Sequence, residues 1–480
     1  MSSDIKESIK ESIKNESKKV LSIIYKQSLD KEEQDSIMER TIQYWKNHIN
    51  EGFLTYRKSV SNEQSYAYLD WADPFQGTSW FIDHRGKKYL DLLGGYGIYN
   101  VGRRHPKIIS AVQAQLMKQA LHSQELLDPL RPYCAYLLSL ISPIEERKEE
   151  REKEREGGDR RLRKCFFTNS GTESVEACLK IAFIHTGRKR ILSTVNAFHV
   201  KTLGSLACTY KEKFRGPFKD ILCDTSYVTY NSIFELEKIF EEQGCTFSCF
   251  ILEPIQGEGG IHVAAKEYLQ KARELCDQYG VVLIFDEVQC GMGRTGKWWA
   301  CEHSGVCPDI MAIGKSFGGG IMPVGACIGT DKVWQKYIEQ PFLLTTTFGG
   351  NPLALSAAIA TINVLIEENI IEDVSEKGEL FIDGLKKLKD RYPFILKDVR
   401  GKGLMIGIEF TENVYGVEFS KRMFSEHVLV AGTLANAETI RIEPSLTITK
   451  DEIIYSLEVC DKVLKEIDKE RKKIFIQSKL

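Results

Sequence analysis

A turn of small polar residues is the first segment whose side chains could bind a ligand. The run FFTNSGTESVEACLK, residues 166–180, predicts a strand, then this turn, then a helix. Ser170, Gly171 and Thr172 lie at the helix start, where free backbone N–H groups and the helix dipole bind anions. Because the GxxxxGK[ST] pattern of a nucleotide-binding P-loop is missing, the turn suits a single phosphate. Ser and Thr are also typical helix N-caps, so the turn alone leaves a purely structural role open.

An acidic residue follows one of the apolar runs. In VVLIFDEVQCGMGRTG, residues 281–296, Asp286, Glu287 and Gln289 come at the end of a predicted strand. In an open α/β sheet, ligands bind at the carboxyl ends of the strands. A carboxylate at that depth needs a partner, and a protonated ring nitrogen such as that of pyridoxal phosphate is a suitable one. A buried Asp that caps the following segment is the alternative.

A lysine follows the next apolar run. DIMAIGKSFGGGIMPVGA, residues 309–326, places Lys315 between a predicted strand and a glycine run. Poor solvation there lowers the pKa of a lysine and makes its amine available for a Schiff base, although many lysines at strand ends only extend to solvent. The combination of the phosphate turn, Asp286 and Lys315 in one α/β domain predicts a pyridoxal 5'-phosphate enzyme whose cofactor is bound covalently by Lys315.

The elements that must position these residues fall into two groups along the chain. Short apolar runs without alternation predict buried parallel strands of an α/β domain. These runs cover residues 165–169, 190–194, 249–254, 281–287 and 309–314. Beyond about residue 360, an amphipathic helical region and short strands at 403–410 and 439–444 predict a smaller α+β unit. Residues 1–50 carry apolar side chains at helical intervals and predict one or two N-terminal helices.

One segment stands apart by its composition. EERKEEREKEREGGDRRLRK, residues 145–164, is almost wholly charged and immediately precedes the strand predicted at 165–169. Such a stretch has no apolar surface to bury, so it predicts a solvated surface insertion without a chemical role.

Composition excludes several classes of protein. The 480 residues are 42% hydrophobic and 28% charged, as in ordinary globular proteins, and no apolar run is long enough for a membrane span. Lys and Arg number 65 against 67 Asp and Glu, so the basic field of a nucleic-acid-binding protein is missing. The 13 cysteines form no CxxC pair and the histidines form no HExxH, so we predict neither disulfides nor a metal site. The polar N-terminus is unlike a secretion signal, and we expect a cytoplasmic protein.

The chain resembles the class III aminotransferases, a family of fold-type I pyridoxal-phosphate enzymes. The shared motifs are LDLLGGYGIYNVGRRHPKIISAVQ, NSGTESVEA, AFH, ILEPIQGEGG, FDEVQCGMGRTG, GKSFGGGIMPVGA, TTTFGGNPLA, RGKGLMIGIEF and IRIEPSLTIT. The resemblance implies an α/β fold, with a large domain around a mostly parallel mixed sheet and a smaller α+β domain built from both chain ends. The implied divisions are an N-terminal helical extension (1–55), the first part of the small domain (56–110), the large cofactor domain (111–359) and the remainder of the small domain (360–480).

Position by position, the resemblance implies a cofactor site. Lys315 binds the cofactor and Asp286 pairs with the ring nitrogen. The other implied contacts are Ser170, Gly171 and Thr172 at the phosphate, Phe198 stacked on the ring with His199 beside it, Gln289 near the ring hydroxyl, and Thr347 at the phosphate of the other subunit's site. Because Thr347 is expected to act across the subunit boundary, the resemblance implies a homodimer.

The resemblance also implies substrates. Glu258 and Arg441 match a pair in which the arginine binds the carboxylate of the keto-acid acceptor and the glutamate neutralises it otherwise. Within the family, the chain is most similar to members that act on putrescine, in GFLTYRKSV, LHSQELLDPLRP, PFLLTTTFGGNPLA and VLVAGTLANAETIRIEP. We therefore expect ping-pong transfer from putrescine, and from related diamines such as cadaverine, to 2-oxoglutarate. The products are 4-aminobutanal, which cyclises to 1-pyrroline, and glutamate.

Two departures from the family pattern bear on these expectations. Val200 stands where the family usually has glycine, so the backbone beside the ring must accommodate a Cβ. Lys201 stands where ornithine-type members have an arginine that binds a carboxylate, which disfavours an amino-acid donor. Ornithine, acetylornithine or 4-aminobutyrate as the donor is the alternative, and a cofactor-binding protein without turnover is a more remote one.

Overall fold

The computed structural model describes residues 3–26, 30–52, 76–83, 86–119, 121, 126–143, 161–434 and 436–477. They form two units. One comprises the described part of 1–75 together with 80–90, and the other comprises 76–79 and the described residues from 91 onward. Within these ranges, no helix combines the length and apolar character that a membrane span requires.

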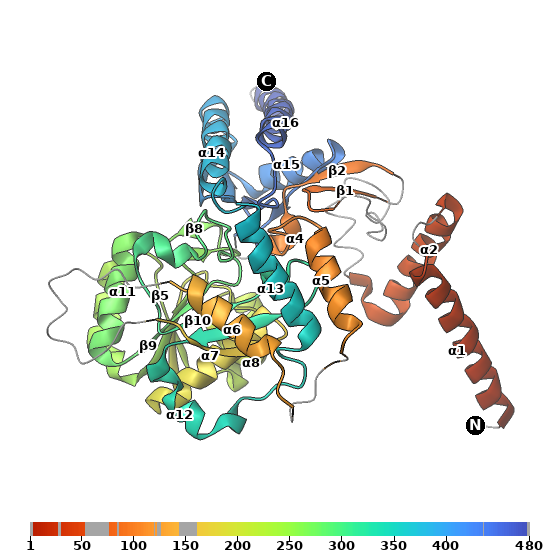
Figure 1. Cartoon of the computed structure of the whole chain (residues 1–480). Coiled ribbons are helices and arrows are strands. Elements are labelled where there is room, and N and C mark those ends of the chain that lie inside the picture. The colour runs from red at the N-terminus through yellow and green to blue at the C-terminus, as the bar shows by residue number, and fades with distance from the viewer. Residues whose placement is uncertain are drawn as a thin grey trace. The chain divides into compact units, whose positions relative to one another are not determined.

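The first unit contains helices and a β-hairpin (Figure 1). Helices α1 (Ser3–Ile24) and α2 (Lys31–Tyr44), with a π-helical turn at Trp45–Ile49, confirm the helices predicted before residue 50. The hairpin pairs β1 (Trp80–Ile82) antiparallel with β2 (Lys88–Asp91). None of the predicted site residues belongs to this unit.

The second unit is built around a seven-stranded sheet with the strand order β3-β11-β10-β9-β6-β4-β5. Its strands are β3 (Lys164–Thr168), β4 (Arg190–Thr194), β5 (Thr225–Val228), β6 (Phe247–Leu252), β9 (Val282–Asp286), β10 (Ile310–Ile313) and β11 (Gly325–Gly329). From β5 to β10 all neighbours are parallel, whereas β11 is antiparallel to both β10 and β3. The predicted mostly parallel mixed sheet is confirmed.

Strand β11 is the element that the apolar runs do not reveal. It follows β10 without a crossover helix, so it returns antiparallel. Strand β3 runs in the same direction as the parallel strands but pairs with β11, which lies between it and β10. The expectation that the run at 165–169 has parallel neighbours is therefore wrong. The sequence GACIG of β11 is short and rich in glycine, and no periodicity marks it as a strand.

The end of the predicted charged insertion also needs correction. Residues 145–160 lie outside the described residues, so their solvation stays a prediction. Leu162, however, is fully buried, the Arg163 N–H donates to the Gly329 carbonyl at 2.9 Å, and Lys164 begins β3. The prediction of a solvated segment is wrong for Leu162, whose apolar side chain is buried, whereas the side chains of Arg163 and Lys164 are exposed as predicted.

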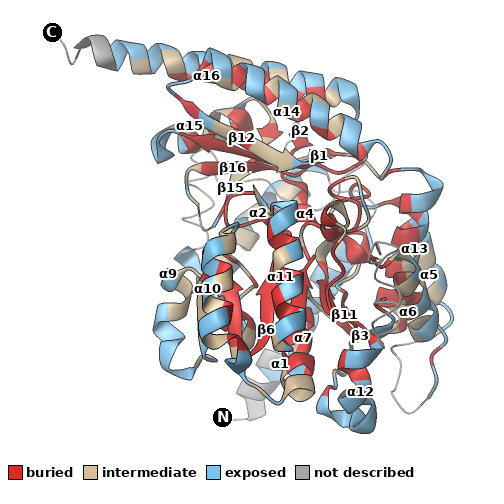
Figure 2. Cartoon of the chain, turned by 90° about the vertical axis from the view of Figure 1, so that its left-hand side faces the viewer, coloured by how far each residue is buried: buried red, intermediate tan, exposed pale blue. Residues whose placement is uncertain are grey.

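Helices flank the sheet, and their outer faces are exposed while the strands are buried (Figure 2). They are α5 (Pro106–Leu116), α6 (Leu130–Ile141), α7 (Gly171–Thr186), α8 (Leu203–Cys208), α9 (Glu212–Arg215), α10 (Ile233–Gln243), α11 (Lys266–Tyr279), α12 (Asp331–Glu339) and α13 (Pro352–Glu367). Short elements at the strand ends include β7 (Ile255–Gln256) and β8 (His262–Val263).

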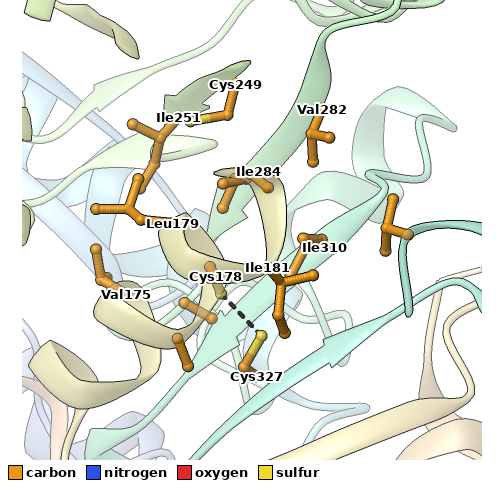
Figure 3. Packing of buried hydrophobic residues seen from close by; sticks show 14 of the residues in the cluster. Val175, Cys178, Leu179, Ile181, Cys249, Ile251, Val282, Ile284, Ile310 and Cys327 are labelled. Carbon is orange, nitrogen blue, oxygen red and sulfur yellow. Dashed lines mark hydrogen bonds between the residues drawn. The ribbon is translucent and has the colours of Figure 1, made fainter. Parts of the chain in front are cut away.

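A core of apolar side chains fixes α7 against the sheet (Figure 3). Leu179 and Ile181 of α7 and Ile284 of β9 are almost completely buried in it. Within this core the Sγ atoms of Cys178 on α7 and Cys327 on β11 lie 3.2 Å apart. Each fully buried large aliphatic side chain stabilises the fold by about 1.5–3 kcal/mol, so α7 is held rigidly and its first turn has a fixed position at the sheet edge.

The helices and strands predicted beyond residue 360 are present. A four-stranded antiparallel sheet has the order β12-β13-β16-β15, with β12 (Leu396–Lys402), β13 (Met405–Phe410), β15 (Ala431–Gly432) and β16 (Thr439–Ile442). Its helices are α14 (Val374–Arg391), α15 (Asn413–Ser425) and α16 (Lys450–Gln477), and the two-residue strand β14 (Val428–Leu429) precedes β15. Strand β16 carries Arg441.

Candidate active site

The predicted chemistry-bearing residues converge on one edge of the seven-stranded sheet. Strands β9 and β10 are parallel with Ala312 opposite Asp286, so Asp286 ends β9 beside the strand that leads into Lys315. Lys315 begins a 3-10 turn, Lys315–Gly318, with a left-handed φ of 45°. Both side chains thus lie at the carboxyl ends of strands, as the sequence predicts.

The surroundings of Lys315 alter its acidity. Burial lowers the pKa of its amine, and this effect outweighs the opposing attraction of the Glu443 and Glu258 carboxylates. A lowered pKa increases the neutral fraction of the amine, which is the nucleophilic form. This lowering of the Lys315 pKa agrees with the expectation from the apolar sequence around Lys315.

Asp286 is held at both carboxylate oxygens. Its Oδ2 lies 2.7 Å from Nδ1 of His199, and its Oδ1 accepts a hydrogen bond from the Val288 N–H at 3.1 Å. His199 is completely buried, and its Nε2 has no hydrogen-bond partner among the residues that the structure describes. Asp286 therefore caps the following segment, which was the structural alternative, while His199 fixes the orientation of its second oxygen.

The start of α7 packs directly against the residue before Lys315. A Cβ on Gly314 would come within 2.9 Å of the Gly171 Cα, so glycine is required for this approach. Ser170 is the N-cap of α7, and its Oγ accepts a hydrogen bond from the Glu173 N–H at 3.3 Å. The capping alternative holds for the Ser170 side chain, while the first-turn N–H groups are the donors that an α-helix offers to an anion.

The hydroxyl of Thr172 belongs to a small network. Its Oγ1 lies 2.9 Å from Thr202 Oγ1 and 3.0 Å from Ser205 Oγ. Both partners bind Glu176, whose Oε1 accepts hydrogen bonds from Thr202 Oγ1 at 2.6 Å and from the Ser205 N–H at 3.0 Å. This network fixes the loop before α8 beside the first turn of α7.

Phe198 lies in an aromatic cluster that contacts the Lys201 ammonium group. Its ring makes an edge contact with Phe214 at a centroid distance of 6.4 Å. The exposed Lys201 places Nζ 4.2 Å from the centre of the Phe214 ring and 5.8 Å from that of Phe198. Lys201, at the position where the resemblance expects an arginine in ornithine-type members, thus makes a cation–π contact with Phe214.

Val200 adopts a backbone conformation that favours glycine. Its φ is 76°, in the left-handed region, which is unfavourable for a β-branched residue. Thr209 holds the strained segment, since its Oγ1 accepts from the His199 N–H at 2.8 Å and donates to the Val200 carbonyl at 2.9 Å. The backbone at Val200 is therefore unfavourable for a residue with a Cβ. As a result, Val200 stores strain next to His199.

Glu443 is a site residue that the sequence analysis did not single out. It is completely buried, and both of its carboxylate oxygens accept from Nε2 of Gln289, at 2.9 and 2.8 Å. Gln289 thus reaches the site, although its amide nitrogen binds a carboxylate here. An available signal was the strand periodicity of two, because Glu443 is two residues beyond Arg441 at the end of an apolar strand.

Glu258 and Arg441 form the expected pair. Arg441 Nη1 donates to Glu258 Oε1 at 2.6 Å and Nη2 donates to Oε2 at 3.0 Å, in a bidentate arrangement. Burial opposes ionisation of Glu258, but the Arg441 guanidinium holds the pKa of Glu258 below its usual value. Burial likewise opposes the charge of Arg441, yet Glu258 and Glu443 raise its pKa. Both groups are therefore charged.

A turn with left-handed backbone conformation lies beside Arg441. The GGYG run of α4 (Gly94–Gly97) has four consecutive positive φ values, from 55° to 87°. Gly94 is required because a Cβ there would lie 2.2 Å from the Glu443 carbonyl oxygen. The turn places the Tyr96 ring 4.8 Å from the Arg441 guanidinium carbon. Sequence reasoning identified this run only as a shared motif and assigned Tyr96 no position.

No hydrogen bond joins the Thr347 side chain to another predicted site residue within the part of the chain that the structure describes. Thr347 is exposed, on the segment after the 3-10 turn Pro341–Leu343. Its neighbour Thr346 accepts a hydrogen bond from Asn169 Nδ2 at 3.1 Å, which places this segment near the end of β3. The expected role of Thr347 in a second subunit's site remains a prediction.

Glu253 links two loops of the site. Its carboxylate accepts from the Phe198 N–H at 3.0 Å and from the Gly257 N–H at 2.9 Å. Burial raises its pKa to about 7, opposed by the nearby His199 and assisted by Asp286. Glu253 was not recognised in the sequence, although it follows a buried strand as Asp286 does.

We predict that Val200→Gly stabilises the protein. Glycine relieves a left-handed strain of ~1–2 kcal/mol, and it costs ~0.5–1 kcal/mol through greater freedom of the unfolded chain. Chemical denaturation should therefore show a higher free energy of unfolding. Val200→Ala is the matched control, since alanine keeps a Cβ and the strain. A glycine variant no more stable than the alanine variant would contradict this account.

We predict that Glu253 makes stability fall with rising pH. Its pKa of about 7 lies above the usual 4.5, so its contribution is complete below 4.5 and is lost as the pH rises through about 7. The melting temperature of Glu253→Gln should decline less over this window than that of the wild type. Glu287, also buried with a pKa raised to about 7, remains in both proteins. If the melting temperatures of the two proteins depend equally on pH, Glu253 does not titrate as proposed.

Comparison with known proteins identifies the family. Residues 75–464 match the family model of the class-III aminotransferases. Ornithine aminotransferase from Toxoplasma gondii, whose active site holds PLP at partial occupancy, shares 26% identity with a TM-score of 0.75 over 90% of this chain and 99% of that one. Acetylornithine aminotransferase from Elizabethkingia anophelis shares 28% identity with a TM-score of 0.73, over 89% and 99%. Adenosylmethionine-8-amino-7-oxononanoate aminotransferase from Methanocaldococcus jannaschii shares 26% identity with a TM-score of 0.78, over 89% and 99%. The chain belongs to the class III aminotransferases, a fold-type I family of enzymes that depend on pyridoxal 5'-phosphate.

Proposed function

We propose that this aminotransferase takes its amino group from putrescine, or a related diamine, and transfers it to 2-oxoglutarate, giving 4-aminobutanal and glutamate. The observation that carries the proposal is the buried Arg441–Glu258 pair. The guanidinium is neutralised by an internal carboxylate, so a donor without a carboxylate binds without disrupting the pair. A donor that presents a carboxylate to Arg441 must first displace Glu258, which costs free energy in a buried site.

The residues present fit pyridoxal 5'-phosphate. Gly171 and Gly314 meet at a contact too close for a Cβ, which leaves the first turn of α7 directly beside Lys315. Lys315 would hold the cofactor covalently, Asp286 would pair with its ring nitrogen, and the N–H groups of Gly171 and Thr172 would bind its phosphate. When bound, the cofactor supplies an electron sink for the bond broken at the donor's amine-bearing carbon.

Lys315 moves the proton in this scheme. Its Nζ takes a proton from the donor carbon and later delivers one, which requires an amine that is neutral at working pH. Burial lowers its pKa in that direction. His199 fixes Asp286 at 2.7 Å, so the carboxylate keeps its orientation while protons move elsewhere in the site.

The acceptor half-reaction uses Arg441. In this proposal Glu258 swings away and the carboxylate of 2-oxoglutarate takes its place on the guanidinium in a bidentate contact. The Tyr96 ring, 4.8 Å from the guanidinium carbon, remains as a cation–π partner that keeps Arg441 in position during the exchange.

A homodimer completes the proposal. Tyr133, Tyr136 and Leu140 lie on one face of α6 and are 65%, 62% and 57% exposed, and Phe348, beside Thr347, is 55% exposed. Monomeric proteins seldom leave large apolar patches uncovered. A second copy of the chain that covers these side chains would carry Thr347 to the phosphate of the partner's site.

Ornithine or acetylornithine as the donor is the second candidate. Two of the similar solved structures are an ornithine and an acetylornithine aminotransferase, at 26% and 28% identity. Against this candidate, Lys201 replaces an arginine and rests on Phe214. Arginine and lysine are not equivalent at a bidentate carboxylate site.

A donor panel tests the proposal. With 2-oxoglutarate as acceptor, we predict the highest kcat/KM for putrescine, with cadaverine next, and at least about tenfold lower values for ornithine, acetylornithine and 4-aminobutyrate. Product glutamate is measured directly. Lys315→Ala should form no glutamate from any donor, which controls for spontaneous transfer. A preference for ornithine or acetylornithine in the wild type would replace the proposed donor with the second candidate.

Arg441 should separate the two half-reactions. Loss of a bidentate contact of ~1.5–3 kcal/mol raises the KM for 2-oxoglutarate by about ten- to hundredfold. The suitable variant combines Arg441→Ala with Glu258→Gln, because Arg441→Ala alone leaves a buried, unpaired carboxylate. Consumption of putrescine in a single turnover, followed by the visible absorbance of the bound cofactor, should change by less than about threefold. Equal damage to both half-reactions would assign Arg441 a structural role.

A further inference from the structure

Glu443 is a buried carboxylate that is held by a neutral amide and lies 3.9 Å from the Arg441 guanidinium. Its hydrogen-bond partner Gln289 is neutral, and its oxygen Oε2 lies 3.9 Å from Arg441 Nη1, which already binds Glu258 at 2.6 Å. Arg294 acts on it only through space, since its guanidinium donates to the carbonyls of Leu404 and Pro444 and to Asn100. Burying a carboxylate is costly unless it is compensated. Gln289 and the cations Arg441 and Arg294 compensate the burial of Glu443.

Two carboxylates act on Arg441. Glu258 and Glu443 both approach its guanidinium, and both also act on the Lys315 amine. Arg441 Nε is buried and has no hydrogen-bond partner within the described part of the chain. Glu258 binds the guanidinium directly, and the Glu443 charge also acts on Arg441, on Arg294 and on the Lys315 amine.

The Glu443 charge acts oppositely on the two kinds of substrate. A cationic amine near Arg441 and Lys315 is attracted by Glu443, whereas a carboxylate that seeks Arg441 meets a second negative charge about 4 Å from its binding partner. At separations of this size, an unscreened unit charge changes binding by a large factor. The sign of the effect depends only on the charge of the substrate.

We infer that Glu443 is a charge-selecting residue, which favours cationic amine donors and disfavours carboxylates at Arg441. The inference rests on the proposed function for its donor class, because a diamine is the substrate that benefits. It extends that function by assigning the selection of substrate charge to Glu443, in addition to the Arg441–Glu258 pair. Gln289 is its positioning residue, holding both oxygens of the carboxylate through one amide nitrogen.

Glu443→Gln tests the inference because it removes the charge and keeps the shape. The kcat/KM for putrescine should fall by about tenfold or more, while that for 4-aminobutyrate should stay constant or rise. The dissociation constant of glutarate, a non-reacting dicarboxylate measured by calorimetry on the holoenzyme, should decrease by about threefold or more. Opposite changes for cations and anions are a signature that general damage to the fold does not produce.

Two further variants control the experiment. Glu443→Asp retains the charge and should lie between wild type and Glu443→Gln in both measurements. Glu438→Gln removes a carboxylate immediately before β16, outside the site, and should change neither value by more than about twofold. Unchanged glutarate affinity in Glu443→Gln, or equal loss for putrescine and 4-aminobutyrate, would overturn the inference. A wild type that uses no diamine would refute the proposed donor instead, and the glutarate measurement would still decide the role of Glu443.

Discussion

The parallel pairing of β9 with β10 is the constraint on which the site depends. It sets Ala312 opposite Asp286, so the carboxylate at the end of β9 and the amine that follows β10 emerge at the same sheet edge. Both strands are buried along their whole length, and the loss of apolar contacts opposes a shift in register. The contact between Gly314 and Gly171 then ties the first turn of α7 to that edge. An amine, a carboxylate and a set of N–H donors are thereby positioned by packing before any ligand binds.

Buried charge imposes a second constraint. Arg441, Glu443 and His199 are completely removed from solvent, and each has a hydrogen-bond partner that partly offsets the loss of hydration. The partners come from distant parts of the chain, so these contacts also bring the four-stranded sheet to the edge of the larger one. The left-handed turn Gly94–Gly97 is part of the same closure, since Gly94 approaches the Glu443 backbone where no Cβ fits.

In the proposed reaction, one site binds a cationic donor and an anionic acceptor in alternation. The proposal meets this need with a guanidinium whose internal carboxylate leaves, because the pair is neutral in one state and cationic in the other. In our inference a second carboxylate, Glu443, stays in place and makes cations the favoured substrates. Glu258 and Glu443 are held by different partners. Glu258 is held by Arg441 itself, whereas Glu443 is held by Gln289. Val200, next to His199, adopts an unfavourable left-handed backbone at the same site.

The sequence by itself determined the elements whose signals are local. Apolar runs marked the buried strands, the residues that follow them marked Asp286 and Lys315, and small polar residues marked the start of α7. The resemblance supplied the pairing of Glu258 with Arg441. Tertiary structure alone decided the insertion of β11 between β3 and β10, the burial of Leu162, the left-handed φ of Val200, and the contacts of His199, Tyr96 and Glu443. Gln289 and Glu443, for example, are 154 positions apart. Such contacts depend on how separate elements pack, and no periodicity or composition within a short segment encodes which distant carboxylate a buried amide will meet.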